Sequence, residues 1–119
     1  LTNWKEELID KDGSIFFAIY NNSVVGTMAL IPRENGVYEL NKMAVNKELR
    51  GNGIGNQLIN FIIDFAKKKK YKSVILYSNS VLKNSIHLYN KFGFKKINIE
   101  NNTPYKRSDI KMELLLSNL

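Results

Sequence analysis

The sequence contains no cysteine and only one histidine. Without cysteine the chain can form no disulfide bond and no thiolate metal site, and such a composition suits a reducing compartment, so we expect a cytoplasmic protein. A single histidine also argues against a histidine-based metal site, because such sites combine several ligands. We therefore predict no metal.

Long apolar runs are missing as well. No stretch reaches the ~18 apolar residues that a spanning helix needs, and no secretory signal is visible, so we expect no membrane partner. Internal repeats and linkers are absent too, and 119 residues fit one domain, residues 1–119. The chain starts at Leu1 rather than Met. We expect further N-terminal sequence to precede it in the complete protein.

The formal net charge is +7. Such a charge can attract an anionic ligand or a nucleic acid, or it can reflect a lysine-rich solvated surface. The lysine run at residues 67–70 ends a predicted helix, where cations suit the helix dipole. No helix-turn-helix or ribonucleoprotein signature is present, and the aromatic residues fall at core spacing. We therefore predict no nucleic-acid partner.

The hydrophobic pattern predicts strands and helices in the order β-β-β-α-β-α-β-β. The segment 4–9 has the pattern of the last turns of a helix. The predicted strands cover residues 15–20, 24–31, 37–45, 73–77, 95–99 and 110–116, and the predicted helices cover residues 53–66 and 84–92. This order indicates an α/β (α+β) fold, with a mixed sheet flanked by helices.

Residues 48–58, Glu-Leu-Arg-Gly-Asn-Gly-Ile-Gly-Asn-Gln-Leu, follow a predicted strand and open a predicted helix. A helix N-terminus presents unpaired N–H groups and a partial positive charge, which together bind anions. Glycines let the backbone approach a pyrophosphate closely, and Arg50 can add a charge-assisted hydrogen bond. The segment lacks the Lys-Ser/Thr of a P-loop and the dinucleotide fingerprint. The alternative is a turn that merely requires glycine.

Three segments together resemble the GNAT superfamily of N-acetyltransferases. Arg50-x-x-Gly53-x-Gly55 is similar to the acyl-CoA loop of that family, and residues 39–45 resemble its fourth strand. Residues 86–94 resemble its Leu-Tyr-x-Lys-x-Gly-Phe segment, and the likeness covers about residues 14–116. The resemblance implies a mainly antiparallel GNAT-like sheet and acetyl-CoA as co-substrate. Residues 105–114 resemble a bacterial subgroup that is sometimes fused to MarR-type regulators.

The sequence also departs from the family pattern. Family members usually carry a first strand and one or two helices before the position of Ile15. In this sequence only 14 residues precede Ile15. We expect that strand and those helices, which help to form the acceptor site, to be largely missing. Leu82 stands where many members have an asparagine. Asn79 and Asn84 are both candidates to replace it against the pantetheine arm.

The resemblance implies a binding site for the CoA portion along the fourth strand and the loop. In the family, the strand N–H at the position of Met43 stabilises the oxyanion of the reaction, and Val45 bonds the pantetheine. The candidate cofactor-binding residues are Met43, Ala44, Val45, Arg50, Gly51, Asn52, Gly53, Ile54, Gly55, Asn79 and Asn84.

Glu39 is the candidate general base. An alkyl ammonium has a pKa near ~10.4, so a base that removes its proton is useful at neutral pH. The resemblance places Glu39 where several members carry their base. Strand alternation predicts that Glu39, Asn41, Met43 and Val45 share one side of the strand. The alternative for Glu39 is a surface carboxylate paired with a lysine.

Tyr89 is the candidate general acid, because a hydroxyl can protonate the leaving thiolate and the resemblance places Tyr89 at the family's acid position. The alternative is a core aromatic beside Phe92. His87 lies on another helix face and is predicted to be a surface residue. Tyr105 and Arg107 belong to a polar loop that either touches the acceptor or is an ordinary loop tip.

These observations predict an N-acetyltransferase that transfers acetyl from acetyl-CoA to a primary amine of a small molecule or protein, by direct attack in a ternary complex. The alternative function is a non-catalytic acyl-CoA-binding or regulatory module. The family resemblance also allows a homodimer, because the final strands of its members often form dimer contacts.

Overall fold

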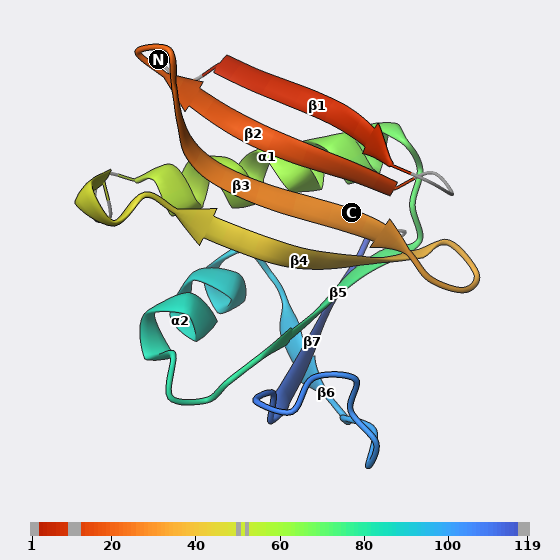
Figure 1. Ribbon diagram of the computed structural model, residues 1–119. Helices are drawn as coiled ribbons and strands as arrows, with labels where there is room; N and C mark the ends of the chain where they lie inside the picture. Colours follow the sequence, from red (N-terminus) through yellow and green to blue (C-terminus); the bar gives the residue numbers. More distant parts are fainter. Residues whose placement is uncertain (1–2, 10–12, 50, 52, 117–119) are drawn as a thin grey trace.

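The computed structural model describes residues 3–9, 13–49, 51 and 53–116. These residues form a seven-stranded sheet with two α-helices and one short 3-10 helix (Figure 1). In chain order the elements are β1 (Asn3–Ile9), β2 (Gly13–Tyr20), β3 (Ser23–Pro32), β4 (Val37–Val45), η1 (Lys47–Leu49), α1 (Ile54–Lys68), β5 (Ser73–Ser78), α2 (Lys83–Lys91), β6 (Lys95–Ile97) and β7 (Ile110–Leu115).

The strands lie in the order β1-β2-β3-β4-β5-β7-β6. Every neighbouring pair is antiparallel except β4 and β5, which run parallel with α1 in the connection between them. A parallel pair needs such a crossover, because the chain must return to the same end of the sheet. The predicted mixed, mainly antiparallel sheet is confirmed. In the described part of the chain, neither helix is long and apolar enough to cross a membrane.

The first element differs from the prediction. The segment 4–9, predicted as the end of a helix, lies within β1, which pairs with β2 in continuous antiparallel register. The Trp4 ring stacks on Phe61 of α1, with 4.4 Å between the ring centroids. Pairing with β2 and packing on α1 outweigh the local helix preference of Lys-Glu-Glu-Leu. The first strand, which the sequence analysis expects to be largely missing, is therefore present as β1 at the edge of the sheet.

The turn between β2 and β3 has a local cause. Asn21 and Asn22 both have positive φ, 51° and 62°, which suits a tight two-residue hairpin turn. Asparagine tolerates this conformation better than other residues that carry a side chain. The strands that the sequence predicts at residues 15–20 and 24–31 therefore form a hairpin.

Helix α1 packs across one face of β1–β4 (Figure 1). Its apolar residues recur at three- and four-residue spacing, so one stripe is buried, and Leu58, Ile59 and Ile62 have no exposed surface. Gly26 of β3 permits close approach, because a Cβ there would lie 3.3 Å from a Leu58 methyl group. The core formed by this packing fixes where α1 begins.

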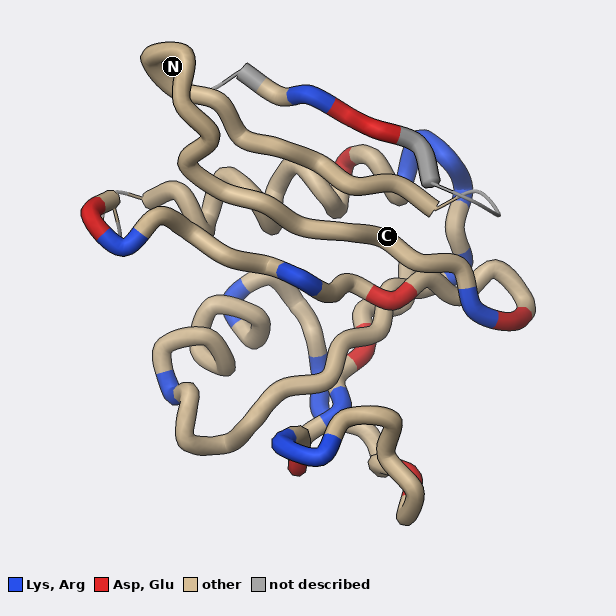
Figure 2. The backbone as a smooth tube through the Cα atoms, viewed as in Figure 1, with Lys and Arg blue, Asp and Glu red and all other residues tan. Residues whose placement is uncertain are grey.

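The lysine run lies at the opposite end of α1 from the glycine loop (Figure 2). Lys67 and Lys68 occupy the last helical turn, and Lys69 is the C-cap residue. Cations at this end interact favourably with the helix dipole. The predicted role of this run at a helix end is confirmed, and much of the basic charge lies away from the candidate phosphate site.

Candidate active site

The parallel strands β4 and β5 separate after a short contact. Their ladder contains three residue pairs, of which Glu39↔Ile75 is the last, although β4 continues to Val45 and β5 to Ser78. Beyond that pair the strands diverge (Figure 1). A cavity of about 530 Å³ occupies the opening. Its lining comprises Glu39, Leu40, Asn41, Lys42, Met43, Leu76, Tyr77, Ser78, Asn79, Leu82, Ser85, Tyr89, Tyr105, Arg107 and Ser108.

A bulge in β4 shapes this opening. Lys42 has a positive φ of 54°, and the register against β3 shifts there, so that Ala29 pairs with Asn41 but Thr27 with Ala44. One extra residue reverses the alternation of side chains beyond it. The prediction that Glu39, Asn41, Met43 and Val45 share one side is therefore wrong. Glu39 and Asn41 lie on one face, and Met43 and Val45 lie on the other, which faces α1.

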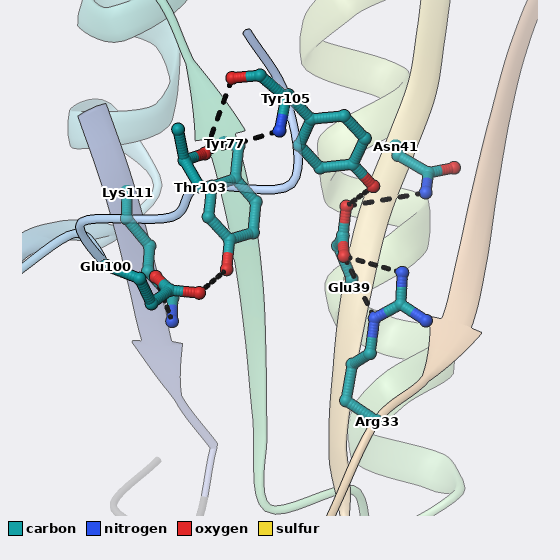
Figure 3. Close-up of polar contacts among 8 residues, drawn as sticks. All are labelled: Arg33, Glu39, Asn41, Tyr77, Glu100, Thr103, Tyr105 and Lys111. Carbon is teal, nitrogen blue, oxygen red and sulfur yellow. Dashed lines mark hydrogen bonds and ion pairs between the residues drawn. The ribbon is translucent and has the colours of Figure 1, made fainter. Parts of the chain in front are cut away.

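Glu39 is almost fully enclosed, with a side chain 2% exposed. Arg33 donates to Oε1 from Nε at 3.0 Å and from Nη2 at 2.8 Å (Figure 3). The Tyr105 hydroxyl donates to Oε2 at 2.5 Å, and Asn41 Nδ2 lies 3.5 Å from the same oxygen. Because the guanidinium offsets the buried charge, the carboxylate can stay in this position. The sequence alternative of a surface carboxylate paired with a lysine is wrong, because the partner is an arginine and the group is buried.

Tyr89 lies on α2 and borders the cavity from the side of Met43. Its hydroxyl donates to Met43 Sδ at 3.9 Å, and its ring lies 5.9 Å from that of Phe94. Burial raises the pKa of the Tyr89 hydroxyl above its ordinary value of 10.0. The phenol therefore keeps its proton at physiological pH. Tyr89 packs against the core and also borders the cavity, so the core-aromatic reading holds, while its role as the general acid stays a prediction.

The glycine loop forms a second cavity, of about 490 Å³, at the start of α1. Gly51 and Gly53 have φ values of 89° and 79°, a region that favours glycine, and Gly53 is the N-cap residue. A Cβ at Gly55 would lie 3.2 Å from a Leu88 methyl group, so α1 and α2 approach closely only because Gly55 has no side chain. The predicted loop residue Ile54 is buried in the core and does not line this cavity.

Two of the predicted loop residues, Arg50 and Asn52, lie outside the described part of the chain. Two other residues of α1 and α2 supply polar groups instead. Lys91 Nζ lies 2.8 Å from Asn56 Oδ1, and both residues line the loop cavity. His87 is exposed, as predicted, yet it borders the same cavity.

The two candidate asparagines lie at different cavities. Asn79 borders the opening between β4 and β5, where Nδ2 donates to the Arg107 carbonyl at 2.5 Å and Oδ1 accepts from the Val81 amide at 3.0 Å. Asn84 borders the loop cavity. The polar atoms of Asn79 bond neighbouring loop atoms, and which of the two asparagines contacts the pantetheine arm stays a prediction.

Ala44 and Val45 do not line the opening between the strands. Ala44 is exposed, and Val45 is half-buried and pairs with Gly26 of β3. Their part in binding stays a prediction.

A third cavity, of about 470 Å³, lies on the far side of Glu39. There the Tyr77 hydroxyl donates to Glu100 Oε2 at 2.6 Å, and Lys111 Nζ lies 3.1 Å from Oε1 (Figure 3). The Tyr77 hydrogen bond is the main cause that lowers the pKa of Glu100 to about 2. Arg33 also borders this cavity, so its walls carry charges of both signs.

The three cavities adjoin one another. Ser85 of α2 lines both the loop cavity and the opening between β4 and β5. Glu39 and Tyr77 line both that opening and the third cavity. Because neighbouring cavities share these lining residues, the cavities form a row from the start of α1, past Tyr89, to Glu39, and we call this row the track. Among the described residues there is no group of three or more His, Cys, Asp or Glu side chains that could hold a metal ion.

The model of the acetyltransferase (GNAT) family matches residues 1–94. The chain belongs to this family.

Individual relatives agree with the assignment. The chain is 35% identical over 83 residues to the protein named probable N-acetyltransferase 14 of Xenopus tropicalis, covering 68% of this chain and 40% of that protein. The curated relatives it matches are longer, and the chain covers 31% to 45% of their length.

Two solved structures share the fold over nearly the whole chain. A GNAT family acetyltransferase from Elizabethkingia anophelis with acetyl-CoA bound has a TM-score of 0.81 at 22% identity, covering 97% of this chain and 98% of that one. The acetyltransferase of Bacillus subtilis in complex with CoA has a TM-score of 0.82 at 18% identity, covering 98% and 99%. The likeness of residues 105–114 to a bacterial subgroup stays a prediction.

Sequence reasoning did not find Arg33, Asn56 or Lys91, and it left Tyr105 undecided. Arg33 meets Glu39 only because the turn after β3 folds it back beside β4. Asn56 and Lys91 meet across two helices whose spacing depends on Gly55. Tyr105 reaches Glu39 from the loop before β7, 66 residues further along the chain. No local pattern in the sequence encodes these contacts.

Proposed function

We propose that the chain is an N-acetyltransferase that transfers the acetyl group of acetyl-CoA directly to a primary amine of a small molecule or protein. The observation that supports this proposal best is the track, the row of neighbouring cavities from the start of α1 to Glu39. A diphosphate suits one end of it, a thioester suits the opening between β4 and β5, and an amine suits the region of Glu39.

The residues at the start of α1 fit the diphosphate of a CoA molecule. The first amides of a helix lack intrahelical acceptors and point outward along its axis. A Cβ built on Gly51 or Gly53 would meet no atom within 4 Å, so the loop faces open space. Lys91 adds a positive charge at the wall of the same cavity. This end of the track therefore favours an anion.

The chemical groups along the track match the needs of acetyl transfer. Acetyl-CoA supplies the thioester, and attack by an amine places negative charge on its carbonyl oxygen and releases a thiolate. Glu39 takes the proton that an alkyl ammonium must lose before it can attack. We assign to the backbone amide of Met43, beside the bulge, the stabilisation of the developing negative charge. The neutral hydroxyl of Tyr89 protonates the thiolate.

Isothermal titration with acetyl-CoA, followed by a panel of primary amines read by free-thiol release, tests this proposal. We expect saturable binding and amine-dependent thiol release. Binding without release over the whole panel would instead indicate a non-catalytic acyl-CoA module. Absence of acetyl-CoA binding would overturn the proposal altogether.

A further inference from the structure

Both carboxylate oxygens of Glu39 already accept hydrogen bonds from neighbouring side chains. Oε1 accepts two hydrogen bonds from Arg33, and Oε2 accepts one from the Tyr105 hydroxyl and lies near Asn41 Nδ2. The side chain is also only 2% exposed. An acceptor amine could therefore touch Glu39 directly only by displacing one of these partners and opening the wall of the cavity.

Tyr105 contacts Glu39 at the wall of the opening. It lines the cavity between β4 and β5, and its hydroxyl ends on Glu39 Oε2 at 2.5 Å (Figure 3). The Tyr77 ring packs against it edge-on, with 5.3 Å between centroids, and Thr103 Oγ1 lies 3.4 Å from both its backbone nitrogen and its carbonyl oxygen. A phenol that donates its proton in one direction still has lone pairs that accept a hydrogen bond from another.

A second polar atom points to an amine beside Tyr105. Asn41 Oδ1 is buried and has no hydrogen-bond partner among the described residues, while Asn41 Nδ2 faces Glu39. A buried acceptor without a donor is costly, so such an atom indicates a missing partner. Asn41 lines the same cavity as Tyr105, and an ammonium group carries enough hydrogens for both oxygens.

We infer that Tyr105 is a catalytic residue, which relays the proton of the acceptor's ammonium group to Glu39 while Asn41 Oδ1 holds the same nitrogen. This inference rests on the proposed acetyl transfer. The N–H bond of the ammonium breaks as an O–H bond forms on Tyr105, and the original O–H bond of Tyr105 breaks as one forms on Glu39 Oε2. The products are a neutral amine, an unchanged tyrosine and a protonated Glu39, which later returns the proton to water.

The surroundings keep Tyr105 in the form that a relay needs. Burial, followed by the hydrogen bond to Glu39, raises the pKa of its hydroxyl above 10.0, so the phenol keeps its own proton at neutral pH. A relay group must give and receive a proton in one event, and therefore must begin neutral. The charged or titratable residues that line the two cavities beside the pair are Arg33, Glu34, Lys42, Tyr77, Tyr89, Glu100, Arg107 and Lys111.

The test uses two acceptors of nearly equal shape. One is the primary alkylamine of the panel that the wild-type protein acetylates fastest, and the other is its aminooxy analogue, in which oxygen replaces the carbon next to the nitrogen. The alkylamine is an ammonium at neutral pH, whereas the aminooxy compound is a free base. For Tyr105→Phe we expect kcat with the alkylamine to fall by roughly 10²-fold. With the aminooxy compound we expect a change of less than about threefold, because no ammonium proton has to be removed.

Tyr20→Phe, the same change at an exposed tyrosine at the end of β2, is the matched control and should leave both rates unchanged. The double variant Tyr105→Phe/Glu39→Gln should be hardly slower than the slower single variant, because both groups serve one proton path. If Tyr105→Phe does not fold, as judged by loss of cooperative unfolding, Tyr105→Leu is the second variant that lacks the hydroxyl.

An equal loss of rate for both acceptors would assign Tyr105 a structural role and overturn the relay. An unchanged alkylamine rate in either variant would also overturn it. Absence of thiol release by the wild-type protein with every amine would contradict the proposed function itself, so the two failures are distinguishable.

Discussion

Glu39 and Met43 lie on opposite faces of β4, although simple alternation would place them on the same face. The extra residue at Lys42, with its φ of 54°, is the cause. Because Tyr89 bonds Met43 and Tyr105 bonds Glu39, the two tyrosines approach the opening from different sides of the strand. In the reaction that we propose, proton removal and proton donation are thereby kept apart.

Glu39→Gln should reduce acetylation of an alkylamine by roughly 10²-fold at neutral pH, because the amide keeps the shape but cannot take the proton. Steady-state thiol release measures this, and acetyl-CoA affinity should stay close to the wild-type value. Glu7→Gln, at an exposed carboxylate of β1, is the matched control. A Glu39→Gln variant as fast as wild type would exclude Glu39 from proton transfer.

Tyr89→Phe should reduce kcat by roughly 10²-fold without much change in acetyl-CoA binding, since the ring still packs near Phe94 while the proton donor is lost. Comparison of turnover with titration calorimetry separates the two effects. Equal turnover in the two proteins would remove Tyr89 from the reaction.

The raised pKa of Tyr89 also gives a prediction about stability in alkali. Below the unfolded-state pKa near 10.0 both states hold a neutral phenol, and the contribution of Tyr89 to stability is fully present. It is lost as the pH rises through the higher folded-state pKa, because the folded protein must then ionise a buried group. Denaturant unfolding at several alkaline pH values should therefore show a smaller loss of stability for Tyr89→Phe than for the wild type.

Gly53→Ala should destabilise the protein by about 1 kcal/mol, because a φ of 79° is strained for a residue with a Cβ. It should also weaken acetyl-CoA binding, since the first turn of α1 begins there. Gly53→Asn should lose less stability, because asparagine tolerates this conformation. Denaturant unfolding and calorimetry measure both effects, and an alanine variant as stable as the asparagine variant would contradict the strain argument.

Asn41→Leu should raise the KM for the amine by about tenfold, because it removes the buried oxygen that we assign to the ammonium group. Its kcat at saturating amine should change much less than that of Tyr105→Phe. Initial rates over a range of amine concentrations separate KM from kcat. A large fall in kcat with an unchanged KM would contradict a binding role for Asn41.

Glu100 should titrate near pH 2, below its ordinary value of 4.5, because Tyr77 and Lys111 bond its charged form. Any stabilisation from this network is present above 4.5 and is lost as the pH falls toward 2. Tyr77→Phe removes the largest cause and should return the pKa toward 4.5, which NMR titration of the carboxyl resonance can follow. A titration that the variant leaves unchanged would show that Tyr77 is not the cause.

The repeating patterns of the sequence determined most of the secondary structure. The spacing of apolar residues in 54–68, the turn residues Asn21 and Asn22, and the glycines at 51, 53 and 55 act through neighbouring residues, so they can be recognised locally. The strand at residues 4–9 could not be recognised locally, because it depends on pairing with β2 and on the stacking of Trp4 upon Phe61. Local preference alone favoured a helix there.

The sequence by itself thus determined the family, and it pointed to the glycine loop as the candidate phosphate site and to Glu39 and Tyr89 as the candidate catalytic residues. Only the tertiary structure decided which groups surround them. The bulge at Lys42 is set by the register between β3 and β4, and the contacts of Glu39 with Arg33 and Tyr105 join distant segments. Such contacts arise when the sheet assembles, since their partners meet only through the fold and not through spacing along the chain.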